Sequence, residues 1–271
     1  MKHTNTQRLV ESALMIAVAT VLSLFKLAEL PYGGSITLAS MLPLVILSYR
    51  HGLGVGLGSA LTYGVLQQLL GLKNLTYFTT PLSVVAIVVL DYLLAFAVCG
   101  LGGILRRAPV KQSVALSCGT ALACVLRYLC HVVSGATVWA GLSIPTSAAL
   151  VYSFIYNATY MLPETLVTVL AAYYLGGLLD FSRTPPVRLE KEATASPLQL
   201  CLGVLVLGCA IYDIAAIFSH MQHPETGEFW LAGLAQPWLW ISVGAVTLIG
   251  AGAVLALTVL RKKQTEGEGA A

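Results

Sequence analysis

Long apolar stretches separated by short polar ones dominate the pattern along the chain. A helix that crosses the hydrocarbon layer needs about 20 mostly apolar residues, because the layer is about 30 Å thick and each residue rises about 1.5 Å. On that rule the pattern predicts an all-α polytopic membrane protein. Its eight expected spans lie near residues 9–28, 39–50, 52–72, 79–105, 113–135, 147–179, 198–219 and 237–260.

A polar, proline-containing stretch, DFSRTPPVRLEKEATASP, interrupts this pattern after the sixth expected span. Prolines and charges between apolar segments are typical of linkers. We therefore expect a six-helix membrane domain at 1–180 and a cytoplasmic linker at 181–197. A two-helix transmembrane appendage with a short cytoplasmic tail is expected at 198–271.

The composition excludes most soluble classes of protein. The 271 residues are 57 % hydrophobic and 10 % charged, with a mean hydropathy of +0.82, whereas soluble domains are typically about 45–50 % apolar and about 25 % charged. The high hydropathy leads us to expect a protein embedded in the lipid bilayer. A net charge of +3 is too small for a nucleic-acid-binding surface, so we expect no nucleic-acid partner.

The sequence carries no pattern typical of an enzyme. It has no G-x-x-x-x-G-K-[ST] phosphate loop, no GxSxG elbow and no HExxH helix. We therefore expect no ATPase activity of its own, no catalytic residue, no metal and no cofactor.

Most basic residues would share one side of the membrane if the expected spans alternate in direction. Because Lys and Arg accumulate in cytoplasmic loops, we expect both termini in the cytoplasm. These residues are Lys2, Arg8, Arg50, Arg106, Arg107, Lys111, Arg183, Arg188, Lys191, Arg261, Lys262 and Lys263.

Asp91 is a carboxylate within the apolar run VVLDYLLAF of the fourth expected span. A charge at this depth is costly, so it is either paired within the protein or used for function. Pairing with Arg127 or with a helix backbone is the structural interpretation. The functional one is a buried carboxylate that awaits a cation.

Further polar and aromatic residues are expected at a depth compatible with that of Asp91. His131 and Trp139 follow in the fifth span and the next outer loop, and the sixth span opens with VYSFIYNATYMLPE. Its tyrosines recur every four residues and share one helix face. They could form an interfacial belt, but Asn157 is not typical of a belt. Aromatic rings, a carboxylate and an amide together predict an outward-opening pocket for a small, planar, nitrogen-rich cation.

The first outer loop, LPYGGSIT, contains two adjacent glycines followed by hydroxyl side chains. Glycine permits positive φ and a close backbone approach. The loop is either a plain turn between two helices or a lid in which Gly34 and Ser35 contact the ligand.

Small residues recur at helical spacing in the first span, at Ala13 and Ala17. Such a face lets another helix approach closely. It serves either internal packing or docking on a partner subunit.

Several blocks of the sequence together resemble a known family. They are GGSITLASMLPLVILSYRHG, LDYLLAFAVCGLGG, RYLCHVVSG followed by Trp139, and YSFIYNATYMLPE, in this order. In these blocks the chain is similar to the thiamine-specific substrate-binding (S) components of energy-coupling factor (ECF) transporters. The resemblance covers about residues 8–180, and the apolar segments after it are a departure from the six-helix family.

The resemblance implies a six-helix fold in a bacterial cell membrane that binds thiamine tightly from outside. It also implies three partner subunits, a transmembrane coupling subunit and two ABC-type ATPases, and it places the docking face on Ala13 and Ala17. The ligand contacts that it implies are Asp91, Tyr92, His131, Trp139, Tyr152 and Asn157.

Alternative functions remain open from the sequence. One is a stand-alone secondary carrier of an organic cation, driven by protons through Asp91 or Glu164. Another is an S component whose ligand is a thiamine precursor.

Overall fold

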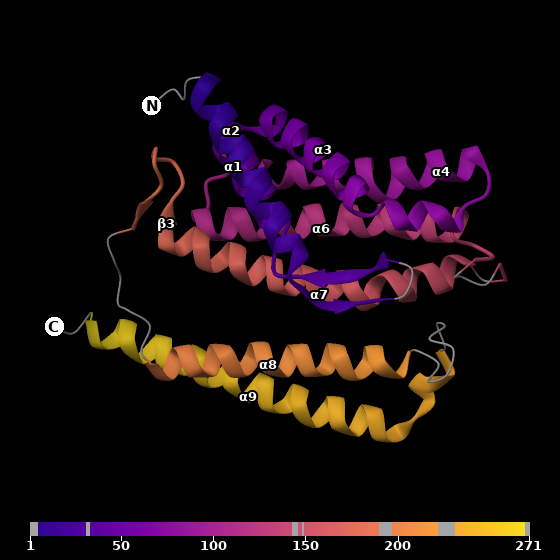
Figure 1. Cartoon of the computed structure of the whole chain (residues 1–271). Helices are drawn as coiled ribbons and strands as arrows, with labels where there is room; N and C mark the ends of the chain where they lie inside the picture. The colour runs from indigo at the N-terminus through magenta and orange to yellow at the C-terminus, as the bar shows by residue number, and fades with distance from the viewer. Residues whose placement is uncertain are drawn as a thin grey trace. The chain divides into compact units, whose positions relative to one another are not determined.

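The chain divides into two compact units, Met1–Leu189 and Glu190–Ala271, in a computed structural model (Figure 1). The structure describes residues 5–30, 33–142, 146–147, 149–189, 197–221 and 231–268. Each unit is described by itself below.

The first unit is a helical bundle with two short hairpins. Its main helices are α1 (Asn5–Leu24), α2 (Leu42–His51), α3 (Leu53–Leu70), α6 (Gln112–Thr137) and α7 (Ala149–Leu178). The paired strands are β1 (Lys26–Glu29) with β2 (Ser35–Thr37), and β3 (Leu179–Asp180) with β4 (Val187–Arg188), both antiparallel.

Among the described residues, six helical segments are long and apolar enough to cross a membrane, as expected of an all-α polytopic membrane protein. They are Asn5–Leu24, Leu53–Leu70, Pro81–Gly103, Gln112–Thr137, Ala149–Leu178 and Pro237–Leu257. The second expected span, at 39–50, is instead the ten-residue helix α2. Gly52 ends α2 with a φ of +94°, a conformation that favours glycine, and α3 begins directly after it.

The fourth expected span is a chain of short helical pieces. α4 (Pro81–Ile87) continues into the π-helical segment η3 (Val88–Leu94), then α5 (Ala95–Ala97) and the 3-10 segment η4 (Val98–Gly103). A π-helical turn widens the helix, and such turns are frequent at functional sites. Asp91 and Tyr92 both lie in η3.

Glycine lets this irregular segment lie very close to α6. A Cβ added to Gly119 of α6 would collide with the carbonyl oxygen of Gly102 in η4. Small residues at such crossings let membrane helices pack without intervening side chains.

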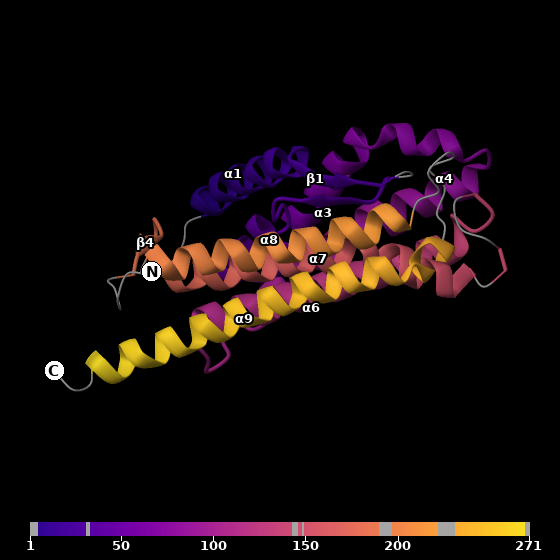
Figure 2. The same cartoon turned by 90° about the horizontal axis from the view of Figure 1, so that it is seen from below.

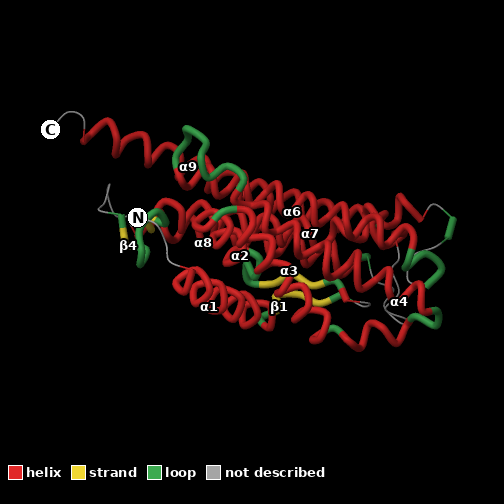
Figure 3. The backbone as a smooth tube through the Cα atoms, turned by 90° about the horizontal axis from the view of Figure 1, so that it is seen from above, coloured by secondary structure: helices red, strands yellow, loops and turns green. Residues whose placement is uncertain are grey.

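The β1–β2 hairpin takes the place of the end of the first expected span, 9–28, and of the loop expected after it, because α1 ends at Leu24. Ala28 pairs with Ile36 and Glu29 with Ser35, and the register shifts between Lys26 and Ala28. Figure 3 shows its two strands in yellow among the helices of the first unit. The hairpin connects α1 to the segment before α2.

Arg50 joins three parts of the first unit near the ends of α1 and α2. Its guanidinium donates to both carboxylate oxygens of Glu11 at 2.9 Å, and to the carbonyl oxygens of Phe181 and Arg183 at 2.7 and 2.8 Å. The first residues of the expected linker are therefore fixed to the helical bundle.

The second unit is a helical hairpin of α8 (Pro197–His220) and α9 (Pro237–Glu268), with a short 3-10 segment, η5 (Leu231–Ala235), before α9. The two helices pack side by side in opposite directions (Figure 2). Thr247 of α9 donates a 2.8 Å hydrogen bond to Asp213 of α8.

Candidate functional site

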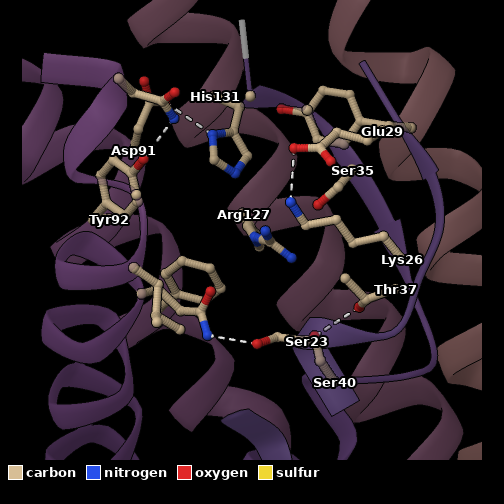
Figure 4. A pocket seen from close by; sticks show the side chains of 18 of the residues that line it. Ser23, Lys26, Glu29, Ser35, Thr37, Ser40, Asp91, Tyr92, Arg127 and His131 are labelled. Carbon is tan, nitrogen blue, oxygen red and sulfur yellow. Dashed lines mark hydrogen bonds and ion pairs between the residues drawn. The ribbon is translucent and has the colours of Figure 1, made fainter. Parts of the chain in front are cut away.

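A cavity of about 270 Å³ lies within the first unit. Its walls come from α1, the β1–β2 hairpin, α3, the 3-10 segment η2 (Leu72–Tyr77), η3, α6 and α7. Figure 4 shows polar side chains from the helices and from the hairpin pointing into the same space.

Asp91 lies at the cavity wall and accepts hydrogen bonds from three side chains. His131 Nδ1 is 2.9 Å from Oδ1, while Ser134 Oγ and Trp139 Nε1 lie 2.7 and 2.9 Å from Oδ2. All three groups come from α6 or the turn after it, 40 to 48 positions after Asp91 in the sequence. The wide turn of η3 (Val88–Leu94) presents Asp91 to α6 at this depth.

The hydrogen bond to Asp91 assigns the tautomer of His131. An ionised carboxylate only accepts, so Nδ1 carries a proton and donates to it, and when the ring is neutral Nε2 is an acceptor. His131 is 8 % exposed and lines the cavity, and its Nε2 has no hydrogen-bond partner among the described residues. This nitrogen can accept a hydrogen bond from a bound ligand.

Arg127, which the sequence left open as a structural partner of Asp91, is engaged elsewhere. Its guanidinium carbon lies 4.4 Å from the centre of the Phe96 ring, and Nη1 is 2.9 Å from the sulfur of Met41. Among the described residues Asp91 forms no ion pair with an arginine. Arg127 also lines the cavity, near its centre in Figure 4, which the sequence analysis did not predict.

Trp139 joins the carboxylate to an aromatic cluster. Its ring meets Phe78 edge to face, with centroids 4.9 Å apart, and lies 6.0 Å from the ring of Tyr77. The indole N–H is directed at Asp91, which fixes the ring plane beside the cavity.

Asn157 of α7 also lines the cavity, but its amide is used within the protein. Nδ2 lies 2.9 Å from the Ser153 carbonyl and 3.2 Å from the His131 carbonyl, and Oδ1 accepts from the Tyr160 hydroxyl at 2.6 Å. Asn157 therefore orients Tyr160, whose ring lies 5.9 Å from that of His131, edge to face.

The predicted tyrosine stripe is divided by the structure. Tyr156 and Tyr160 line the cavity. Tyr152 is not among the described lining residues, and it packs instead against the cluster of Phe78 and Trp139. One helical turn separates Tyr152 from Tyr156, which moves it beyond the cavity along α7.

Tyr92 completes the wall on the side of η3. Its hydroxyl accepts a 2.9 Å hydrogen bond from Asn74 of η2. A Cβ added to Gly71 would collide with that hydroxyl oxygen, so glycine leaves room for Tyr92 where α3 ends.

Gly34 and Ser35 lie at the hairpin side of the cavity. A Cβ added to Gly34 would stand 2.8 Å from the Tyr160 ring, while Gly33 has a φ of +111°. The two glycines thus have different roles. Gly34 permits a close approach to α7, and Gly33 permits a backbone conformation that residues with a side chain rarely adopt.

Glu164 holds the hairpin to α7 and does not line the cavity. It is 1 % exposed, and its carboxylate accepts from the Thr37 hydroxyl at 2.6 Å and from the Thr37 backbone N–H. Glu164 therefore contributes a structural contact to β2.

Three charged side chains from β1 and η2 lie together beside the hairpin. Glu29 is 2.7 Å from the Lys26 ammonium and 3.7 Å from the Lys73 ammonium. The hydrogen bond from Lys26 holds the pKa of Glu29 below its usual value, with partial burial opposing this effect. All three residues line the cavity. They lie apart in the sequence, and no pattern there predicted that they would meet.

Ala13 and Ala17 are exposed on α1, together with Leu14 and Val18. Glu11, which faces Arg50, lies on another side of the helix, since two residues correspond to about 200° of rotation. The small-residue face is thus open in the first unit.

No group of three His, Cys, Asp or Glu side chains that could hold a metal ion occurs in the part of the chain that the structure describes.

Known proteins match the first unit. The family model described as thiamine transporter protein matches residues 9–179. Thiamine transporter ThiT of Bacillus subtilis is 32 % identical over 171 residues, which are 59 % of this chain and 85 % of that protein.

A solved structure of ThiT from Listeria monocytogenes has the same fold, with a TM-score of 0.52 and 24 % sequence identity. The match covers 62 % of this chain and 92 % of that one. The match of the family model over most of the first unit confirms the resemblance seen in the sequence. This multi-pass membrane protein belongs to the thiamine transporter family.

Proposed function

We propose that this chain is the thiamine-binding S component of an ECF importer in a bacterial cell membrane. It captures thiamine from outside and delivers it inward with a transmembrane coupling subunit and two ABC-type ATPase subunits. Membership of the thiamine transporter family and the chemistry of the cavity support this proposal.

The cavity offers a complementary group to each part of thiamine, which joins a cationic thiazolium to an aminopyrimidine. The observation that carries the proposal is the Asp91 carboxylate, which accepts hydrogen bonds from His131, Ser134 and Trp139 and forms no ion pair with an arginine among the described residues. A carboxylate in a low-dielectric site favours a cationic group placed beside it. Nε2 of His131 can accept from an exocyclic amine, and the rings of Tyr92 and Trp139 supply aromatic faces.

The remaining site residues have supporting roles in this proposal. Asn157 fixes Tyr160, and Gly34 and Ser35 bring the β1–β2 hairpin over the ligand. Tyr152 supports the aromatic cluster that contains Trp139, against which it packs.

We infer that the coupling subunit docks on Ala13 and Ala17, because this face of α1 is exposed and small. The distribution of basic residues supports cytoplasmic termini. Residues 198–271 then form a two-helix transmembrane appendage to the thiamine-binding domain, connected by the segment 181–197.

Thiamine titration of the purified full-length chain tests the proposal. We expect saturable binding in the nanomolar range, measured by tryptophan quenching and by calorimetry. Asp91→Asn and His131→Ala should each weaken binding at least about tenfold, since a hydrogen bond to a charged group is worth about 1.5–3 kcal/mol. Ser242→Ala in α9, outside the cavity, is the control. Wild-type affinity in both site variants would refute the assigned site.

Reconstitution separates the importer from a stand-alone carrier. The chain alone in liposomes should bind thiamine without accumulating it, and uptake should require the coupling subunit, the ATPases and ATP. Proton-driven uptake by the chain alone would establish the carrier instead.

A further inference from the structure

Ser134 is a buried hydroxyl that touches the key carboxylate but not the cavity. It is 0 % exposed and does not belong to the described residues that line the cavity. It lies three residues after His131 on α6, so both side chains face η3. Its hydroxyl donates a 2.7 Å hydrogen bond to Oδ2 of Asp91.

Ser134 also sets the position of Trp139. Its carbonyl oxygen accepts from the backbone N–H of Val138 at 2.7 Å and from that of Trp139 at 3.2 Å. These bonds close the end of α6, and they turn the Trp139 indole back onto the oxygen that the Ser134 hydroxyl contacts. One residue therefore holds the carboxylate by its side chain and the tryptophan by its backbone.

The distribution of donors on Asp91 determines which oxygen is available to a ligand. A carboxylate offers about four lone-pair sites, two on each oxygen. Ser134 and Trp139 use both sites on Oδ2, while His131 uses one on Oδ1. The remaining site is on Oδ1, and Nε2 of His131 is a second polar atom of this pair without a partner among the described residues.

We propose that Ser134 is a positioning residue for ligand recognition. It fixes the rotation of the Asp91 carboxylate, so that Oδ1 is directed at the ligand and Oδ2 at the protein. Because Ser134 is neutral, it orients the acid without cancelling its charge. An oriented acceptor binds more tightly, since its rotamer freedom is lost on folding and not on binding. This inference rests on the proposed thiamine site.

The test is a double-mutant cycle between Ser134 and Asp91 in the full-length chain, read by thiamine calorimetry. Ser134→Ala should weaken binding about tenfold, equivalent to about 1.4 kcal/mol. In the Asp91→Asn background the same change should weaken binding less than about twofold, because its target is gone. Equal losses in both backgrounds would show that Ser134 acts independently of Asp91 and would overturn the proposal.

A matched control and a conservative variant separate positioning from stability. Thr120 is also 0 % exposed on α6, and its hydroxyl donates only to the Leu116 carbonyl at 2.7 Å. Thr120→Val should leave the affinity unchanged. Ser134→Cys retains a weak donor of similar size and should bind with intermediate affinity. If Ser134→Ala does not fold, the cycle with Ser134→Cys decides, and unchanged affinity in that variant would overturn the proposal.

The failures of the two proposals are distinguishable. A wild-type chain that does not bind thiamine contradicts the proposed function. A wild-type chain that binds thiamine and loses it in Asp91→Asn, but not in Ser134→Ala, contradicts only the role of Ser134.

Discussion

Replacement of Arg50 by alanine tests how the first unit is held together at the ends of α1 and α2. The side chain of Arg50 is 0 % exposed, and it forms a bidentate ion pair with Glu11 and donates to the carbonyl oxygens of Phe181 and Arg183. Arg50→Ala leaves the carboxylate with a hydrogen bond to His51, at 2.7 Å, and removes one donor from each carbonyl.

The magnitude follows from the groups that lose their partners. Removal of one member of a buried ion pair costs about 3–5 kcal/mol. The Glu11 side chain is 21 % exposed, so water recovers part of this energy, while each carbonyl adds up to about 1 kcal/mol. We expect the free energy of unfolding to fall by about 2–4 kcal/mol, which lowers Tm by roughly 4–16 °C.

Thermal unfolding in detergent measures this change, followed by the reactivity of Cys99 and Cys124, two buried free cysteines of the first unit. Arg183→Ala is the matched control, because the Arg183 side chain is 70 % exposed and pairs with Asp180 only at 3.3 Å. It should change Tm by less than about 2 °C. A Tm for Arg50→Ala within that range would refute the reasoning and show that water replaces all four bonds.

Two further predictions concern the β1–β2 hairpin. Gly34→Val should weaken thiamine binding at least about tenfold, because its Cβ would stand 2.8 Å from the Tyr160 ring. Gly58→Val on α3, where a Cβ meets nothing within 4 Å, should bind like wild type, and equal affinity in both variants would exclude a close approach of the hairpin. The Lys26 hydrogen bond lowers the pKa of Glu29 from 4.5, so its stabilisation is present at neutral pH and is lost as pH falls through the lowered value. Hydrogen exchange of β1 should therefore stay constant from pH 7 to about 5, after correction for intrinsic rates, and increase below about pH 4. Glu29→Gln should remove this transition, and an unchanged transition in that variant would assign it to another group.

The sequence indicated several features because they are local. Apolar runs of about 20 residues locate the spans, since the bilayer imposes one length on every crossing. Asp91 was recognised from its apolar neighbours, because charge in such a run is rare and costly. The tyrosine spacing on α7 predicted one shared face, and Tyr156 and Tyr160 do line the cavity.

Other residues had no local signal. Arg127 lines the cavity and its guanidinium packs on Phe96. The sequence had suggested it only as a possible partner of Asp91. Ser134 looked like any small residue in an apolar helix, yet its hydroxyl contacts a carboxylate 43 positions earlier. Glu164 was expected as an alternative proton carrier, and the structure places it against Thr37, 127 positions away.

The sequence by itself determined the membrane environment, the approximate spans and the chemical types available for a ligand site. Only the tertiary structure decided which of these side chains meet, and through which atoms. One residue more or less in a helical turn rotates a side chain by about 100°, so the π-helical segment at Val88–Leu94 sets the direction of Asp91. Hydrogen bonds act over about 3 Å, and that distance depends on helix rotation and packing, which no local pattern of apolar residues specifies.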